Sequence, residues 1–284
     1  MSKLKSFVFL ATVVSLLACE TPSSSGNDAS VMALFDTPES VLWDAQRRVW
    51  YVSNIAGDSA TADGIGWIAR LDEDGNALDA RWVEGLDAPK GMALLGGRLY
   101  VADLAEVVEV DIAAGVVLRR IPAPGAVFLN DVAAGDGIIY VSDSFGSAVY
   151  ALAPEDEEAH VLVRDPALAS VNGLVVDGSR LIAGTIGDFM DPTDLGHLLS
   201  VSLEDAHVST IVMNAGKLDG IERDGDGWIA TDFRGLLVRF EGDGRQRVLF
   251  DLTALGLASA ADLGFDPERR LAGLPDLFRS EVVF

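Results

Sequence analysis

Short apolar segments separated by turns that contain glycine and aspartate dominate the chain from residue 31 onward. The turns include Asp74-Gly75-Asn76, Asp136-Gly137, Asp177-Gly178 and Asp243-Gly244. No long stretch follows the 3.6-residue period of an amphipathic helix. Many short strands between such turns predict an all-β protein.

The apolar segments fall into six groups that repeat every 40 to 51 residues. The first group, for example, comprises four expected strands at 40–44, 49–53, 66–72 and 79–83. A period of this size, with up to four strands in each repeat, is typical of propeller blades. The sequence therefore predicts a six-bladed β-propeller over residues 31–284.

The two ends of this region predict how the ring of blades closes. The last repeat has three apolar segments, whereas residues 31–35 form a strand-like segment ahead of the first repeat. We expect residues 31–35 to supply the outer strand of the last blade, because closure of this kind leaves no large unpaired edge.

Each repeat has an equivalent position at the start of its first strand. These six strand-start positions are Glu39, Lys90, Asn130, Asn172, Asp219 and Ala261. Because the first strand of a blade is the innermost, we expect the six side chains to surround the central channel at one face. The loops after the second strands open on the same face, and the two long ones, 55–65 and 186–196, should rim a pocket.

Four of these positions carry oxygen-bearing side chains, namely Glu39, Asn130, Asn172 and Asp219. Hard oxygen donors on a rigid ring suit Ca²⁺, with Mg²⁺, Mn²⁺ and Zn²⁺ as alternative cations. Ca²⁺ takes roughly 6–8 ligands, so three or four side chains leave positions for water and substrate. The alternative is that each residue is an ordinary solvated or Asx-turn residue. Their equivalence in four of six repeats favours a common site.

Other residues near this face have open interpretations. Lys90 could orient an anionic group of a substrate, balance charge or point outward. Phe189 and Met190 lie in the loop 186–196 and are candidate substrate contacts, although such residues more often pin a loop to the body. The aspartates that end second strands are expected to brace loops as hydrogen-bond acceptors: Asp103, Asp143, Asp232 and Asp276. No role is assigned to the histidines, which are expected in loops or outer strands: His160, His197 and His207.

Several of these segments carry a family resemblance. Residues 38–44, Pro-Glu-Ser-Val-Leu-Trp-Asp, resemble the opening motif of the senescence marker protein (regucalcin)/gluconolactonase family. Leu129-Asn130-Asp131, Val171-Asn172-Gly173-Leu174 and Leu218-Asp219-Gly220-Ile221 resemble its later motifs, in the same order and at similar spacing. The resemblance covers essentially all of residues 31–284.

The resemblance implies a six-bladed propeller and, for several members, hydrolysis of sugar lactones or related esters with a divalent cation. It implies that Glu39, Asn172 and Asp219 are metal ligands and that Asn130 binds the substrate or a water on the metal. Ser40 stands where the family commonly has glycine, and the repeat around Lys90 is closer to the general propeller repeat called NHL. No counterpart of the family's substrate-side arginine is evident, so the expected substrate is a small ester or lactone rather than a sugar lactone in particular.

Two functions follow as expectations. The first is a metal-dependent hydrolase, in which the cation polarises the carbonyl and Asp219, or a water held between Asp219 and the metal, acts as base. Activated water is favoured, because a carboxylate bound to a cation has a lowered pKa. The alternative is a lipid-anchored binding or scaffold propeller with a structural metal, since fold alone does not imply catalysis.

The first 30 residues predict export and a lipid anchor. Two lysines precede the apolar run 7–17, and the following Leu16-Leu17-Ala18-Cys19 looks like a bacterial lipobox. We therefore expect a signal peptide over 1–18, lipidation of Cys19 and a flexible linker over 19–30. Glu20, rather than aspartate, follows the cysteine, which favours the outer membrane, with the domain facing the periplasm. The alternative is an ordinary signal peptide or uncleaved anchor with an incidental cysteine.

Composition adds two limits. The chain contains one cysteine, so it has no intramolecular disulfide. Its formal charge of −23 argues against a nucleic-acid partner, which requires basic residues for the phosphates. The acidic balance suits a monomer and also a protein that binds a cation, although a solvated acidic surface without special meaning is the more common case. The expected partner is a small-molecule substrate.

Overall fold

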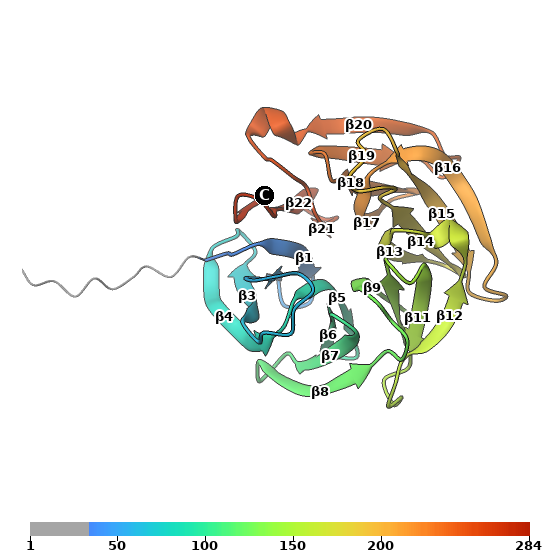
Figure 1. Cartoon of the computed structure of the whole chain (residues 1–284). Coiled ribbons are helices and arrows are strands. Elements are labelled where there is room, and N and C mark those ends of the chain that lie inside the picture. The colour runs from blue at the N-terminus through green and yellow to red at the C-terminus, as the bar shows by residue number, and fades with distance from the viewer. Residues whose placement is uncertain (1–33) are drawn as a thin grey trace, which may run out of the picture. The chain divides into compact units, whose positions relative to one another are not determined.

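The computed structural model describes residues 34–284, which lie in one compact unit, Ala33–Phe284. Six antiparallel sheets follow one another around a ring (Figure 1). Five sheets have four strands and the sixth has three. The described residues contain two short 3₁₀-helices, η1 (Pro166–Leu168) and η2 (Leu252–Leu255), and no α-helix. The prediction of an all-β, six-bladed propeller is confirmed.

Each blade is formed by consecutive strands. Blades 1 and 2 contain β1 (Pro38–Asp44), β2 (Val49–Asn54), β3 (Gly66–Asp72), β4 (Ala77–Leu86), β5 (Pro89–Leu95), β6 (Arg98–Asp103), β7 (Glu106–Asp111) and β8 (Val116–Pro122). Blades 3 and 4 contain β9 (Leu129–Gly135), β10 (Ile138–Asp143), β11 (Ala148–Leu152), β12 (His160–Arg164), β13 (Val171–Asp177), β14 (Arg180–Thr185), β15 (Gly196–Ser202) and β16 (Val208–Gly216). Blades 5 and 6 contain β17 (Leu218–Asp224), β18 (Gly227–Asp232), β19 (Leu236–Phe240), β20 (Gln246–Asp251), β21 (Gly264–Asp266), β22 (Leu271–Asp276) and β23 (Glu281–Val283).

The core lies between neighbouring blades, and strand β6 shows why the sequence produces it. Successive side chains of a strand point to opposite faces of the sheet. Leu99 and Val101 accordingly pack in the cluster shared with blade 1, whereas Tyr100 and Ala102 pack in the cluster shared with blade 3. Burial of each large apolar side chain contributes about 1.5–3 kcal/mol. A strand that is apolar on both faces therefore packs against both neighbouring blades.

The ring closes differently from the expectation for residues 31–35. Leu34 and Phe35 lie outside any strand, and residues 31–33 lie outside the described part of the chain. The blades join instead at their innermost strands, where the Val41 amide donates to the Asp262 carbonyl at 3.2 Å and the Asp262 amide donates to the Glu39 carbonyl at 3.0 Å. Leu34 and Phe35 add apolar contacts to the cluster between the first and last blades.

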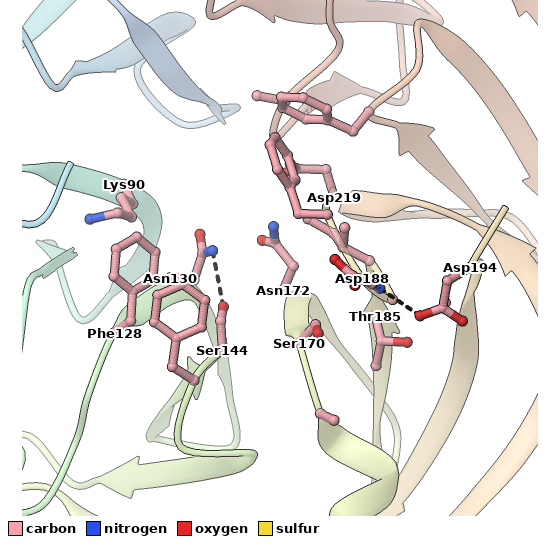
Figure 2. Close-up of a pocket in the computed structure, with 18 of the residues that line it drawn as sticks. Lys90, Phe128, Asn130, Ser144, Ser170, Asn172, Thr185, Asp188, Asp194 and Asp219 are labelled. Carbon is pink, nitrogen blue, oxygen red and sulfur yellow. Dashed lines mark hydrogen bonds between the residues drawn. The ribbon is translucent and has the colours of Figure 1, made fainter. Parts of the chain in front are cut away.

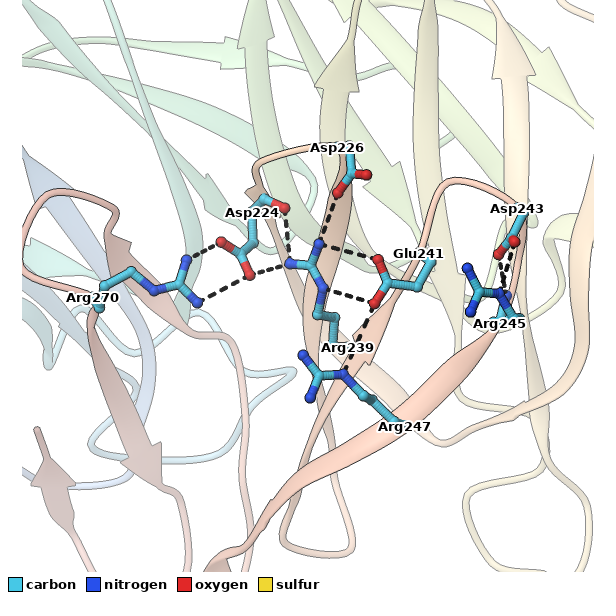
Figure 3. A network of polar contacts seen from close by, with 8 residues as sticks. All are labelled: Asp224, Asp226, Arg239, Glu241, Asp243, Arg245, Arg247 and Arg270. Atoms are coloured by element: carbon cyan, nitrogen blue, oxygen red, sulfur yellow. Dashed lines mark hydrogen bonds and ion pairs between the residues drawn. The ribbon is translucent and has the colours of Figure 1, made fainter.

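A charged network links blades 5 and 6 at the end of β17 that lies away from Asp219 (Figure 3). The largely buried Arg239 donates to the backbone carbonyl of Asp224 at 2.9 Å and pairs with Asp226 and Glu241 at 2.9 and 3.2 Å. Arg239 also pairs with the Asp224 carboxylate, and Arg270, in the turn between β21 and β22, pairs with the same carboxylate. These hydrogen bonds with both arginines and their charges lower the pKa of Asp224, with the bond from Arg270 the largest cause.

The predicted signal peptide (1–18), the lipidated Cys19 and the linker (19–30) lie outside the described residues. Within residues 34–284, no helix has the length and apolar character required to cross a membrane.

Candidate functional site

The aspartates that end second strands hold the segment just before the first strand of their own blade. Asp103 accepts the Ala88 amide at 2.7 Å, and Asp143 accepts the Phe128 amide at 2.9 Å. Asp276 accepts the Ser259 hydroxyl at 2.9 Å in the last blade. The predicted bracing role is confirmed for these three aspartates, and it fixes the segment that leads into the first strand.

Close approach of the innermost strands explains the glycine that follows three of the strand-start residues. A Cβ atom on Gly173 would lie 1.9 Å from the backbone oxygen of Asp219, and one on Gly220 would lie 2.3 Å from Asp262 Oδ1. At Gly91 it would lie 2.2 Å from Asp131 Oδ1. Residues with side chains do not fit at such distances, so these glycines allow the strands to meet around the channel.

A cavity of about 830 Å³ opens at this face of the ring. All six strand-start residues line it: Glu39, Lys90, Asn130, Asn172, Asp219 and Ala261. Both long loops contribute to its wall, with Ile55 and Ser59 from the first and Ile186 to Phe189 from the second. The expectation that these positions and loops meet at one face is confirmed. Met190 is 84% exposed and lies outside the cavity wall.

Three oxygen atoms at the base of the cavity lack hydrogen-bond partners although they are buried: Glu39 Oε2, Asn172 Oδ1 and Asp219 Oδ1. Among the described residues, no other carboxylate or amide oxygen is buried in this way. Within residues 34–284, no group of three His, Cys, Asp or Glu side chains is arranged to bind a metal. The three oxygens here do not form such a group, because only two of them belong to carboxylates. An unpartnered buried oxygen is unfavourable by about 1–3 kcal/mol. Two carboxylates and one amide oxygen therefore fit a hard divalent cation, which binds oxygen atoms that have no hydrogen-bond donor.

The electrostatics of these residues agree with that fit. Burial raises the pKa of Glu39, and repulsion from Asp219 and Asp262 raises it further, while Lys90 opposes the shift. Burial and repulsion from Asp262 also raise the pKa of Asp219, while the neighbouring Asn172 amide opposes that shift. A cation between the carboxylates would offset their repulsion and favour the charged forms.

Lys90 and Asn130 lie on the left of the view in Figure 2, and Asn172, from the next blade, lies beside Asn130 with Asp219 beyond it. The Asn130 amide donates to Ser144 Oγ at 3.1 Å, which orients its side chain. Lys90 is buried, and its Nζ donates to the carbonyls of Ala88 and Ser59 at 3.0 and 3.2 Å. Burial lowers the pKa of Lys90, whereas Glu39 and Asp103 raise it. Lys90 thus faces the cavity while it fixes the loop 55–65.

The sequence interpretation missed two buried carboxylates one residue beyond the strand starts, Asp131 and Asp262. Asp262 accepts the Ser40 hydroxyl at 2.5 Å, and burial raises its pKa to about 7. Asp131 accepts the Leu174 amide at 2.6 Å, and burial also raises its pKa. A signal for them exists in the sequence, because these two repeats have aspartate where three others have glycine.

The sequence interpretation also missed several residues of the cavity wall. His197, which received no role, lines the cavity, and its Nδ1 accepts the Asn214 amide at 3.1 Å. Phe128, Phe145 and Phe233 line it as well. Phe145 and Phe233 follow the aspartates that end second strands, so their place in the repeat was visible in the sequence.

Comparison with known proteins identifies the fold and no family. No protein-family model matches the chain, and no curated protein matches it. A chain in the crystal structure of a nidogen/laminin complex is similar at 15% identity over 78% of this chain and 90% of that one, with a TM-score of 0.60. PorZ, a bacterial surface component of the type-IX secretion system of Porphyromonas gingivalis, is similar at 15% identity, with a TM-score of 0.54. That match covers 84% of this chain and 30% of PorZ. At such identities the likeness concerns the fold alone.

Proposed function

We propose that this protein is a divalent-cation-dependent hydrolase of a small ester or lactone. One observation carries the proposal: the three unpartnered buried oxygens belong to Glu39, Asn172 and Asp219, on the wall of an open cavity. They are the residues that the resemblance to the senescence marker protein (regucalcin)/gluconolactonase family implies as ligands. Ca²⁺ suits these donors best, and Mg²⁺, Mn²⁺ and Zn²⁺ are the alternatives.

A cation held by these three residues would polarise the carbonyl of an ester or lactone and stabilise the negative charge that develops on its oxygen. The chain supplies the remaining functions. The Asn130 amide donates one hydrogen to Ser144 Oγ, which orients the side chain. Its second N–H and its carbonyl oxygen would hold the substrate. Asp219 orients the attacking water, because a carboxylate beside a cation is a weak base. Lys90 would position an anionic part of the substrate.

The alternative function is a binding or scaffold propeller in which the metal is structural. A structural metal is normally enclosed by protein ligands, whereas a catalytic one keeps positions open to substrate. The residues that carry the three oxygens line a cavity of about 830 Å³ that opens at one face of the ring. This openness supports the hydrolase over the scaffold.

Turnover of a panel of lactones and aryl esters by the purified protein tests the proposal. After removal of metal with a chelator, we expect Ca²⁺ or one of the other three cations to restore hydrolysis. Asp219→Asn and Glu39→Gln should each reduce kcat/KM by roughly 10²–10³-fold, the effect typical of lost electrostatic stabilisation. Glu157→Gln, at an exposed position outside the cavity, is the matched control and should retain activity.

Calorimetric titration with the same cations separates binding from turnover. The native protein should release or take up heat, and Glu39→Gln should lose that signal. Activity that survives in Asp219→Asn, or a native protein without turnover under any of the cations, would refute the proposed hydrolase.

A further inference from the structure

Four consecutive blades each place a phenylalanine in the loop between their second and third strands at the cavity face. These residues are Phe145, Phe189, Phe233 and Phe278, in blades 3, 4, 5 and 6. A fifth, Phe128, precedes the first strand of blade 3 and lines the cavity. The described residues contain ten phenylalanines, so half of them gather at this face of the ring.

The five rings form two groups. In the first, Phe128 and Phe145 lie with ring centroids 4.7 Å apart, and Lys90 Nζ lies 4.4 Å from the Phe128 ring (Figure 2 shows Phe128 beside Lys90). In the second, Phe233 contacts Phe189 at 5.2 Å and Phe278 at 5.8 Å in edge-to-face geometry. The second group therefore forms a continuous aromatic row along blades 4 to 6, in which Phe189 and Phe233 line the cavity and Phe278 extends the row outside its wall.

These rings are not core residues. Phe145 is 70% exposed, Phe189 is 54% exposed and Phe278 is 63% exposed. Contiguous exposed apolar side chains at the mouth of a cavity typically mark a binding surface. Loops on a rigid scaffold are also where proteins place ligand contacts.

The rest of the cavity wall carries apolar side chains beside polar residues such as Ser170, Asp188 and His197. Ile55, Ile186 and Leu277 contribute apolar surface. Two further polar side chains accept backbone hydrogen bonds, since Thr185 Oγ1 accepts the His197 amide at 2.8 Å and Asp194 accepts the Asp188 amide at 2.7 Å. The three buried carboxylate and amide oxygens without a partner, by contrast, belong to strand-start residues.

We propose, on the basis of the hydrolase function above, that the substrate is an ester or lactone bearing an extended apolar substituent, such as an alkyl chain or an aryl group. The carbonyl lies at the base, near Glu39, Asn172 and Asp219, and the apolar substituent lies against the two phenylalanine groups. A cavity of about 830 Å³ accommodates such a ligand, since small-molecule sites span about 300–1,000 Å³.

A homologous series of γ-lactones tests this inference. The lactones carry alkyl chains from methyl to heptyl, with a phenyl-substituted lactone and a polyhydroxylated lactone as separate arms, all measured with the activating cation. We expect kcat/KM to rise about two- to fourfold with each added methylene, as the transfer of a CH₂ group from water predicts. The phenyl arm shows whether aryl groups share the site. Equal rates along the series, or a preference for the polyhydroxylated lactone, would overturn the inference.

Substitutions test whether the phenylalanine rings cause the dependence of kcat/KM on chain length. Phe145→Ala and Phe189→Ala should each lower the ratio of kcat/KM between the longest and shortest lactones about three- to tenfold, because each removes an aromatic contact. Phe250→Ala is the matched control, since Phe250 is 60% exposed on β20 and lies outside the cavity. An equal change of the ratio in Phe250→Ala would contradict the assignment. Thermal melting establishes that each variant is folded.

Binding of γ-lactams with the same alkyl chains distinguishes failure of this inference from failure of the hydrolase. Lactams resist hydrolysis, so calorimetric affinities report the apolar contacts without turnover. Affinity that increases with chain length supports an apolar ligand even where no lactone is hydrolysed, and in that case the hydrolase alone is refuted. Affinity that is independent of chain length overturns the inference whether or not lactones are turned over.

Discussion

The three unpartnered oxygens of Glu39, Asn172 and Asp219 lie in a part of the channel where most other polar groups are satisfied. Ser40 donates to Asp262, and Ser144 donates to the carbonyl of Val171 at 2.6 Å. A protein optimised for stability alone would partner or remove such oxygens, because each is unfavourable by about 1–3 kcal/mol. At the residue scale, these unpartnered oxygens therefore support the proposed cation site.

Glu222 provides a prediction at the same scale. This half-buried residue of β17 lines a smaller cavity of about 180 Å³ with apolar neighbours such as Leu42 and Val132. Burial, and then repulsion from Asp262, raises its pKa to about 8 from 4.5. Between pH 4.5 and about pH 8, the Glu222 carboxyl loses its proton in the unfolded chain but keeps it in the folded protein. The free energy of unfolding therefore decreases as pH rises through this range, by at most about 1.4 kcal/mol per pH unit.

Glu222→Gln removes this titration. In denaturant unfolding with a chelator present, the variant should match the native protein near pH 4.5 and exceed its stability at pH 8, by about 1–2 kcal/mol after allowance for partial exposure. The chelator keeps the other channel carboxylates equivalent in both proteins. If the unfolding free energies of the two proteins change in parallel between pH 4.5 and pH 8, Glu222 does not titrate in this range.

The long loops illustrate the element scale. Each is held by a buried lysine of the following blade: Lys90 Nζ donates to the Ser59 carbonyl, and Lys217 Nζ donates to the Asp188 and Asp194 carbonyls at 2.6 and 3.1 Å. A loop of this length would otherwise have few contacts with the sheets. The lysines therefore give the cavity wall a defined position.

Lys217→Met tests this arrangement. Loss of two hydrogen bonds from a charged donor should destabilise the loop 186–196 by about 1.5–3 kcal/mol. We expect faster amide hydrogen exchange in that loop, and a raised KM for alkyl lactones because Phe189 lies within it. Arg245→Met is the control, since Arg245 is 79% exposed and pairs with Asp243 in a turn. Unchanged exchange in 186–196 would show that Lys217 does not hold the loop.

At the scale of the whole molecule, the proposed location depends on residues outside the described domain. We propose that Cys19 is lipidated and attaches a monomeric propeller to the bacterial outer membrane, on the periplasmic side. The sole cysteine of the chain stands where a lipobox requires it, followed by a Ser-, Thr- and Gly-containing segment. An anchored enzyme of this kind would meet small-molecule substrates in the cell envelope.

Expression in a bacterial host with labelled palmitate checks the anchor. The native chain should incorporate label and sediment with outer membranes, whereas Cys19→Ser should remain unlabelled, because no other thiol exists in the chain. Label in Cys19→Ser, or a native chain recovered without label in the soluble fraction, would contradict the proposal.

The sequence by itself determined the architecture and the main group of site residues. Strand alternation and repeat spacing are local properties, so they identified blades before any contact was known. Equivalent register then brought Glu39, Asn130, Asn172 and Asp219 to one cavity, because every first strand starts at the same face of the ring.

Only the tertiary structure decided the features that depend on loop direction and on contacts between distant repeats. Phe189 faces the cavity while the adjacent Met190 does not, and Phe233 joins rings from two neighbouring blades. Asp262 meets Ser40 across 222 residues of chain. The repeat pattern of the sequence does not encode these contacts, because they arise from how the blades pack and where each loop is fixed.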